Sequence, residues 1–230
     1  MNKPASILVI AAHPDDEVLG CGGTMARLAA EGASVSILIL ANGLTSRADY
    51  DPVRDAAALK LHHERAHRAG RLVGAKEVTL GGFPDQRMDT VPLLEITQAI
   101  EREIARVRPD TIFTQHGGDL NMDHVITFRA TLTATRPMAG GPVKRVYAYE
   151  VGSSTEWSFQ QFEPRFQPQV FFDIAAQLET KLAAMQVYAS ETRAFPHPRS
   201  PEAIRATALR WGSVAGLGAA EAFQLVREIR

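Results

Sequence analysis

Short apolar runs alternate with longer amphipathic segments along most of the chain. The apolar runs predict buried strands at residues 6–12, 35–40, 77–80, 111–114, 143–149 and 169–173. Segments with apolar residues at helical spacing predict helices at residues 19–31, 55–73, 91–108, 123–135, 174–188 and 201–212. Strands that alternate with helices are typical of parallel βαβ units. The pattern therefore predicts an α/β fold built on a mostly parallel sheet.

Length and composition narrow the class of protein. The 230 residues fit one domain covering 1–230, because no repeat, low-complexity stretch or clear linker interrupts the pattern. The formal charge of −1 gives no reason to expect nucleic acid or an anionic membrane surface as a partner. The single Cys21 excludes an internal disulfide and a cysteine-based zinc cluster within one chain. No apolar run approaches the ~20 residues that span a bilayer, and no secretory signal precedes the first strand, so we expect a cytoplasmic protein.

The densest group of polar chemistry follows the first predicted strand. Positions 13–17 hold one His and three carboxylates, in the order His-Pro-Asp-Asp-Glu. In open α/β sheets, ligands bind beyond the carboxyl ends of the strands, and right-handed crossovers place the loops that follow the strands on one edge. We therefore expect the loops at 42–54, 82–89 and 115–124 to converge with 13–17 on one site.

This cluster has the composition of a metal site. His13 and Asp16 lie three residues apart, so a tight turn that enters a helix can direct both side chains at one point. The best candidate for a third ligand is His124, which follows another predicted strand at the start of a helix. Two His and one carboxylate with open positions form a usual ligand set of catalytic zinc. The same set also suits ferrous iron.

The two remaining carboxylates of the cluster each have two possible roles. Asp15 can take the proton of a metal-bound water, whose pKa zinc lowers to about 7. Its alternative role is to cap the helix that follows. Glu17 can support the metal ligands from behind, or it can stabilise the first helical turn through the helix dipole.

The string AHPDDE at residues 12–17, with the Asp-His pair at 123–124, resembles the PIG-L/LmbE-like family of zinc-dependent sugar N-deacetylases. The resemblance covers most of the chain. It implies a Rossmann-like, mostly parallel sheet with helices on both faces. It implies a zinc ion held by His13, Asp16 and His124, and Asp15 as the general base. The implied reaction is hydrolysis of an N-acetyl group on an amino sugar, with release of acetate.

The chain departs from the family pattern in the downstream motif. Many members carry His-x-x-His there, and the first His supports the oxyanion or acts as an acid, whereas this chain has Asn121 in that place. Asn can donate a hydrogen bond from its amide but cannot deliver a proton. We therefore expect Asn121 either to stabilise the oxyanion as a catalytic residue or to position its loop. Asp123, which would orient the missing His, is expected to support the site from behind.

Four further side chains are candidates for contacts with the sugar. His62, with His63 as the alternative, lies on the helix where several family members carry a substrate-binding Arg. The others are Arg87 in the loop that follows residues 81–85, Asp119 in the downstream motif, and His197 between two prolines. Each also has a plain structural alternative: an exposed helix residue, an ordinary turn, a helix cap and a packed surface loop.

The sequence therefore predicts a metal-dependent hydrolase that removes the N-acetyl group of a GlcNAc-type amino sugar or its conjugate. A metal-bound water would be the nucleophile and Asp15 the general base. One alternative is an amide hydrolase that acts on a thiol-precursor glycoside or another small acylated amine. Another is a metal-dependent carbohydrate-binding module without turnover. Family members often form trimers or hexamers, so the resemblance also implies a homo-oligomer.

Overall fold

A computed structural model of the chain describes residues 5–43, 51 and 53–230. In this part of the chain, seven strands form one sheet in the order β3-β2-β1-β4-β5-β7-β6. Neighbours from β3 to β5 pair in parallel, and β7 runs antiparallel to both of its neighbours. The strands are β1 Ser6–Ala11, β2 Ser34–Ala41, β3 Glu77–Phe83, β4 Thr111–Gln115, β5 Arg145–Tyr149, β6 Val170–Asp173 and β7 Ala220–Glu228. This topology confirms the predicted Rossmann-like α/β class with a mostly parallel sheet.

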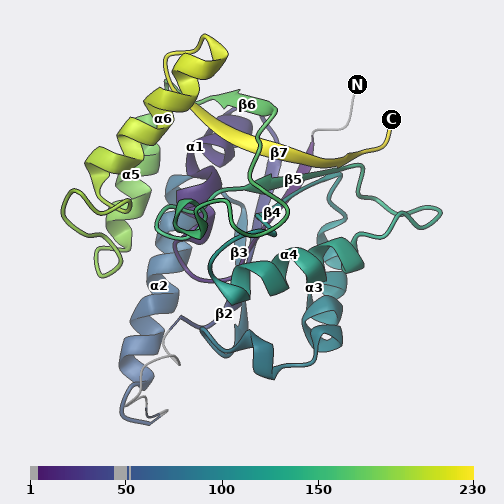
Figure 1. The fold of residues 1–230 in the computed structure, drawn as a ribbon. Helices are drawn as coiled ribbons and strands as arrows, with labels where there is room; N and C mark the ends of the chain where they lie inside the picture. The colour runs from purple at the N-terminus through teal and green to yellow at the C-terminus, as the bar shows by residue number, and fades with distance from the viewer. Residues whose placement is uncertain (1–4, 44–50, 52) are drawn as a thin grey trace.

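Helices cover both faces of the sheet (Figure 1). They are α1 Asp16–Ala30, α2 Ala56–Leu72, α3 Leu93–Val107, α4 Met122–Ala134, α5 Leu178–Val187 and α6 Pro201–Ala215, with short 3-10 turns at Met88–Thr90 and Glu156–Ser158. Successive side chains of a strand point to opposite faces. In β1, Ile7 and Val9 therefore belong to the core under α1, α2, α5 and α6, and Leu8 and Ile10 belong to the core under α3 and α4. The continuous apolar runs of the central strands follow from this two-sided burial.

Two elements differ from the prediction. The strand β7 was missed, because an antiparallel strand inserted between β5 and β6 breaks the alternation of strand and helix on which the prediction rested. The strand β3 runs through Gly81 and Gly82 to Phe83, where a turn was predicted. A Cβ at Gly81 would lie 2.7 Å from the carbonyl oxygen of Leu40, so glycine permits the close approach of β2 there.

The helix α1 contains a kink at Cys21, whose φ and ψ angles of −146° and 24° are not helical. A kink exposes backbone groups that need new partners. The carboxylate of Glu221 accepts hydrogen bonds from the backbone N–H groups of Gly23 and Thr24, at 3.0 and 2.7 Å. Lys181 Nζ donates to the carbonyl oxygen of Leu19 at 2.8 Å and to Glu221 Oε1 at 2.6 Å. We call this buried Lys181–Glu221 pair the helix clamp.

A membrane crossing would need a helix that is both long and apolar, and none of the helices in the described residues meets this requirement.

Candidate metal centre

The site lies where the strand order of the sheet reverses. β1 has β2 on one side and β4 on the other, and the chain continues outward from each of these neighbours. Such a reversal leaves a crevice beyond the carboxyl ends of the two central strands. Residues 13–17 follow β1 and residues 116–124 follow β4. The fold therefore brings together two motifs that lie more than a hundred residues apart in the sequence.

Three buried side chains bring potential ligand atoms together in this crevice. One nitrogen of His13, one nitrogen of His124 and one carboxylate oxygen of Asp16 lie within 4.8 Å of one another. Asp16 Oδ2 is 3.2 Å from His13 Nδ1 and 3.2 Å from His124 Nε2. Asp16 begins α1, and its N–H bonds to the carbonyl oxygen of His13 at 3.3 Å. This single turn directs both side chains at the same point.

A second carboxylate lies behind each imidazole. Asp123 Oδ2 is 3.0 Å from His13 Nε2, and Asp119 Oδ2 is 3.3 Å from His124 Nδ1. This arrangement leaves His13 Nδ1 and His124 Nε2 directed at Asp16. Carboxylates placed in this way fix the ring orientation and the tautomer of metal-binding histidines. Asp119, predicted to contact the sugar, therefore lies against a ligand candidate and also accepts hydrogen bonds from the hydroxyls of Ser154 and Thr155.

The carboxylates favour positive charge at both imidazoles. Burial alone lowers the pKa of His13, but its contacts with Asp123 and Asp16 outweigh this effect and raise the pKa to about 10. Burial likewise lowers the pKa of His124, whereas Asp16 and Asp119 raise it to about 9. The pKa of Asp16 is held well below its usual range, because the two imidazoles outweigh the effect of its burial. The site is thus electrostatically suited to a cation.

Unpaired polar atoms show that the residues fit a metal ion. Among the described residues, Asp16 Oδ1 is buried without a hydrogen-bond partner, and both ring nitrogens of His124 are buried beside carboxylate oxygens at 3.2 and 3.3 Å without hydrogen-bond geometry. Such atoms cost about 1–3 kcal/mol each when nothing binds them. Asp16 Oδ2, in contrast, already accepts hydrogen bonds from the backbone N–H of His13 and from Gln115 Nε2, both at 2.9 Å. Two imidazoles and a carboxylate are also the donor types that zinc and ferrous iron prefer.

A second group of ligand atoms shares His13 with the first. It consists of His13, Asp85 and Asp123, whose atoms also lie within 4.8 Å of one another. In this group, Asp123 Oδ1 already accepts the backbone N–H of Met88 at 3.0 Å. The first group contains the unpaired atoms and has a supporting carboxylate behind each imidazole. We therefore regard His13, Asp16 and His124 as the better candidate set.

Asp15 lies beside this set and is 2% exposed. It occupies the N-cap position of α1, yet its side chain makes no capping hydrogen bond, and its φ of 112° is rare for a residue other than glycine. Its carboxylate contacts Arg199 instead, at 2.7 Å. Burial raises the pKa of Asp15 well above its ordinary value, and the guanidinium of Arg199 opposes this effect. A buried carboxylate with a raised pKa is suited to accept a proton.

Glu17 stabilises the turn at residues 13–17 through hydrogen bonds of its side chain. Its carboxylate accepts the backbone N–H of Asp15 at 3.0 Å and the hydroxyl of Tyr188 at 2.7 Å. Burial raises the pKa of Glu17 to about 7, although both of these hydrogen bonds act in the opposite direction. The structure thus places Glu17 behind the turn, away from the candidate ligand atoms.

Asn121 is the N-cap of α4 and is tied to a neighbouring loop. Its Oδ1 accepts the backbone N–H of Asp123 at 2.9 Å, and its Nδ2 donates to Gln86 Oε1 at 3.0 Å. The helix cap fixes the orientation of the Asn121 amide, and the hydrogen bond from Asn121 then fixes that of the Gln86 amide. The Gln86 amide nitrogen lies 3.4 Å from His13 Nε2 as a result. Asn121 therefore connects the start of α4 to the loop that carries Gln86.

A polar cavity of about 280 Å³ opens beside the ligand set. It is lined by His13, Pro14, Asp15, Gly43, His62, Asp85, Gln86, Ser190, Glu191, Arg193 and Arg199. His62 is 4% exposed, and a Cβ at Gly43 would lie 2.7 Å from its ring. Of the four predicted substrate contacts, only His62 lines this cavity. Arg87 is exposed on the loop, and His197 packs against Trp157 and accepts the backbone N–H of Arg199.

Sequence reasoning missed Gln86, Gln115 and Arg199. Gln115 is the last residue of β4, and amide side chains carry no motif that distinguishes a ligand support from a plain strand end. Arg199 lies in the proline-rich segment 195–201, from which His197 was selected. Only the fold shows that this Arg is partly buried and that its carboxylate partner is Asp15. Most of the polar loop at 42–54 lies outside the described residues.

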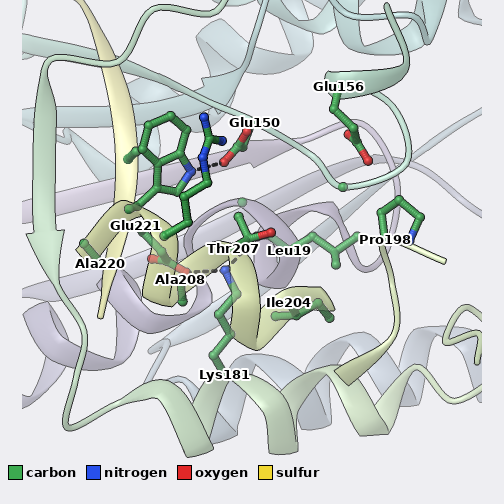
Figure 2. A pocket seen from close by; sticks show the side chains of 15 residues that line it. Leu19, Glu150, Glu156, Lys181, Pro198, Ile204, Thr207, Ala208, Ala220 and Glu221 are labelled. Carbon is green, nitrogen blue, oxygen red and sulfur yellow. Dashed lines mark hydrogen bonds and ion pairs between the residues drawn. The ribbon is translucent and has the colours of Figure 1, made fainter. Parts of the chain in front are cut away.

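A second cavity of about 240 Å³ lies between α1, α6 and β7 (Figure 2). Pro198 lines this cavity and Arg199 lines the first, so the Pro198–Arg199 segment lies between the two. Glu150 accepts a hydrogen bond from the indole N–H of Trp211 in this cavity, and the helix clamp forms part of its wall.

Comparisons with known proteins agree with the geometry of the site. Residues 8–135 match the model of the PIG-L family, described as GlcNAc-PI de-N-acetylase. The uncharacterized deacetylase YaiS of Escherichia coli is 29% identical over 195 residues, which cover 82% of this chain and 93% of that protein. A 1D-myo-inositol 2-acetamido-2-deoxy-alpha-D-glucopyranoside deacetylase of Nakamurella multipartita is 33% identical over 174 residues, which cover 63% of this chain and 59% of that protein.

A solved structure with the same fold covers nearly the whole chain. The conserved protein TT1542 of Thermus thermophilus matches with a TM-score of 0.77 and 27% identity, over 98% of this chain and 96% of that one. The family match begins within β1 and ends after α4, so it includes both halves of the candidate metal centre. The chain belongs to the PIG-L family of de-N-acetylases.

Proposed function

We propose that the protein hydrolyses the N-acetyl group of a GlcNAc-type amino sugar or its conjugate and releases acetate. The observation that carries this proposal is the buried set of His13, Asp16 and His124 beside Asp15, in a cavity with a predominantly polar lining. The proposal is also supported by the name of the Nakamurella relative, a deacetylase of a 2-acetamido-2-deoxy-glucopyranoside. A polar cavity of about 280 Å³ is compatible with one sugar ring and its hydroxyl groups.

In this proposal His13, Asp16 and His124 hold a zinc or ferrous ion, with Asp123 and Asp119 fixing the two imidazoles. When bound, such an ion lowers the pKa of water and polarises the amide carbonyl.

Asp15 then performs the proton transfers. Its carboxylate accepts the proton of the attacking water as the new C–O bond forms at the amide carbon. The same carboxyl group returns that proton to the nitrogen of the leaving amine as the C–N bond breaks. Asn121 holds Gln86 at the rim of the cavity, where the Gln86 amide is available to donate to an oxygen of the substrate.

The test is a panel of acetylated amines incubated with protein of known metal content. GlcNAc, its inositol conjugate and a nucleotide-linked GlcNAc represent the proposed class, and N-acetyl amino acids represent small acylated amines without a sugar. We expect acetate release from at least one sugar and none from metal-depleted protein. Release from the amino acids alone would favour the general amide hydrolase. Sugar binding without acetate release would favour a binding module.

A further inference from the structure

Arg199 makes a partly buried ion pair with the proposed general base. Its Nη1 donates to Asp15 Oδ2 at 2.7 Å, and the two side chains are 21% and 2% exposed. Because the Asp15 carboxylate is shielded from water, loss of its Arg199 partner would leave a buried charge without compensation. The Asp15 carboxylate raises the pKa of Arg199, so the guanidinium stays charged.

The guanidinium is itself fixed from two sides. Its Nε donates to Ser153 Oγ at 2.8 Å and approaches the carbonyl oxygen of Gly152 at 3.4 Å, both in the loop that follows β5. The next residue, Ser200, caps α6 by accepting the N–H of Ala203 at 3.0 Å. Arg199 is therefore anchored by a helix start and by a loop of the sheet, and it has little freedom to move away from Asp15.

The backbone and the side chain of Asp15 are held by different partners. Glu17 binds its backbone N–H, in the turn that gives Asp15 its φ of 112°. Arg199 binds its carboxylate. The other charges that act on this carboxylate include those of Asp16, Glu17 and Glu191, and all three are of like sign. Without Arg199, the carboxylate would face repulsion from these groups and would lose its fixed orientation.

We propose that Arg199 is a positioning residue that holds the Asp15 carboxylate in a fixed orientation beside the candidate metal ligands. This inference rests on the proposed function of Asp15. Arg199 also lines the cavity, so direct contact with the substrate is the competing role. The two roles affect different kinetic constants. A residue that positions a proton acceptor affects kcat, whereas a contact that binds the substrate equally well in the ground state and the transition state affects KM.

The experiment compares Arg199→Met, which keeps most of the side-chain length without the charge, with Arg199→Lys, which keeps the charge without the planar guanidinium group. For Arg199→Met we expect kcat to fall about ten- to hundred-fold with KM within about two-fold, because small misplacement of a reacting group has costs of this size. We expect Arg199→Lys to keep more activity than Arg199→Met, and added guanidinium ion to restore part of the kcat of Arg199→Ala. The metal content of all three variants should equal that of the wild type.

The matched control is Arg205→Met, because Arg205 forms an exposed pair with Glu179 on the same helix that Arg199 precedes. It should leave kcat and KM unchanged. A crystal structure of metal-loaded Arg199→Met gives a readout that does not depend on turnover, and we expect the Asp15 carboxylate to be displaced while His13, Asp16 and His124 keep their places. The inference is overturned if the carboxylate stays in place or if only KM changes. If wild-type protein releases no acetate, the proposed function fails, and the crystal structure still decides the positioning role.

Discussion

In the described residues, two clusters of buried charged groups contact α1: the metal centre at its first turn and the helix clamp at the kink near Cys21. They differ in how fully their polar atoms are paired. In the helix clamp, Lys181 and Glu221 bind each other, and both oxygens of Glu221 bind backbone N–H groups of α1. In the metal centre, Asp16 Oδ1 is equally buried without a hydrogen-bond partner, and the ring nitrogens of His124 have only the carboxylates of Asp16 and Asp119 beside them, at 3.2 and 3.3 Å without hydrogen-bond geometry.

This difference separates a structural cluster from a functional one. A buried polar group without a partner is costly, so a fold retains it where a ligand supplies the missing interaction. The charged atoms of the clamp are already paired, so the clamp needs no ligand, and it stabilises the kink within α1. The metal centre needs one, and it uses the first turn of the same helix. Substitutions in the two clusters should therefore affect different properties of the protein.

The largest effect is expected at Asp15. Substitution Asp15→Asn preserves the shape of the side chain and removes the proton acceptor. We expect kcat for acetate release to fall about 10²- to 10⁴-fold, the usual contribution of a general base. Metal content, measured by elemental analysis, should not change, because Asp15 is outside the ligand set. A variant that keeps wild-type kcat would show that another group takes the proton.

The grouping of the three candidate ligands was largely predictable from the sequence, because two of them lie in one turn. His13, Asp15 and Asp16 share one turn, so their spacing in the sequence determines their spacing in space. His124 could be added because it follows a strand, and parallel strands end at the same edge of a sheet. The central part of the fold was predictable for the same reason, since β1 to β5 alternate with helices.

The contacts made by the C-terminal part of the chain could not be predicted. Arg199, which meets Asp15, lies in the loop between α5 and α6, and Glu221, which meets Gly23, lies in the antiparallel strand β7, so neither follows a strand of the parallel βαβ pattern. Asp119 and Asp123 could be assigned to the site but not to their imidazole partners, because a carboxylate near a histidine in sequence can face either a ligand or a sugar. Arg87 and His197 lie in loops near the site, and the direction of a loop side chain has no periodic signal.

The next largest effect is expected in the clamp and concerns stability. Substitution Lys181→Met leaves Glu221 as an unpaired buried charge, and we expect the free energy of unfolding to fall by about 3–5 kcal/mol. The double variant Lys181→Met/Glu221→Gln removes both charges and should recover much of this loss. Denaturant unfolding of metal-depleted protein measures both values without a contribution from bound metal. If the single and double variants lose equal stability, the pair does not act as a clamp.

A smaller effect is expected at Asn121, which combines a helix cap with a contact to Gln86. Substitution Asn121→Asp keeps an oxygen for the N–H of Asp123, and its charge suits a helix N-terminus. Substitution Asn121→Ala removes the cap, and we expect it to lower the free energy of unfolding by about 1 kcal/mol relative to Asn121→Asp. Both variants lose the Nδ2 donor that binds Gln86 Oε1. A fall in kcat shared by both would therefore report on Gln86, and a fall confined to Asn121→Ala would report on the cap.

The smallest effect is expected in the second cavity, at Glu150, and it depends on pH. Burial raises the pKa of Glu150 above its ordinary value of 4.5, and the hydrogen bond from Trp211 opposes this effect only in part. A carboxyl group whose pKa is higher in the folded state favours folding while it is protonated, and this contribution is lost as the pH rises through the folded pKa. Substitution Glu150→Gln cannot ionise, so it should become progressively more stable than the wild type as the pH rises from 4.5. Thermal unfolding of both proteins across this range measures the difference, with Glu64→Gln on the exposed face of α2 as the matched control. A difference that stays constant with pH would mean that Glu150 ionises at no cost in stability, and the second cavity would then resemble the fully paired clamp rather than the incompletely paired metal centre.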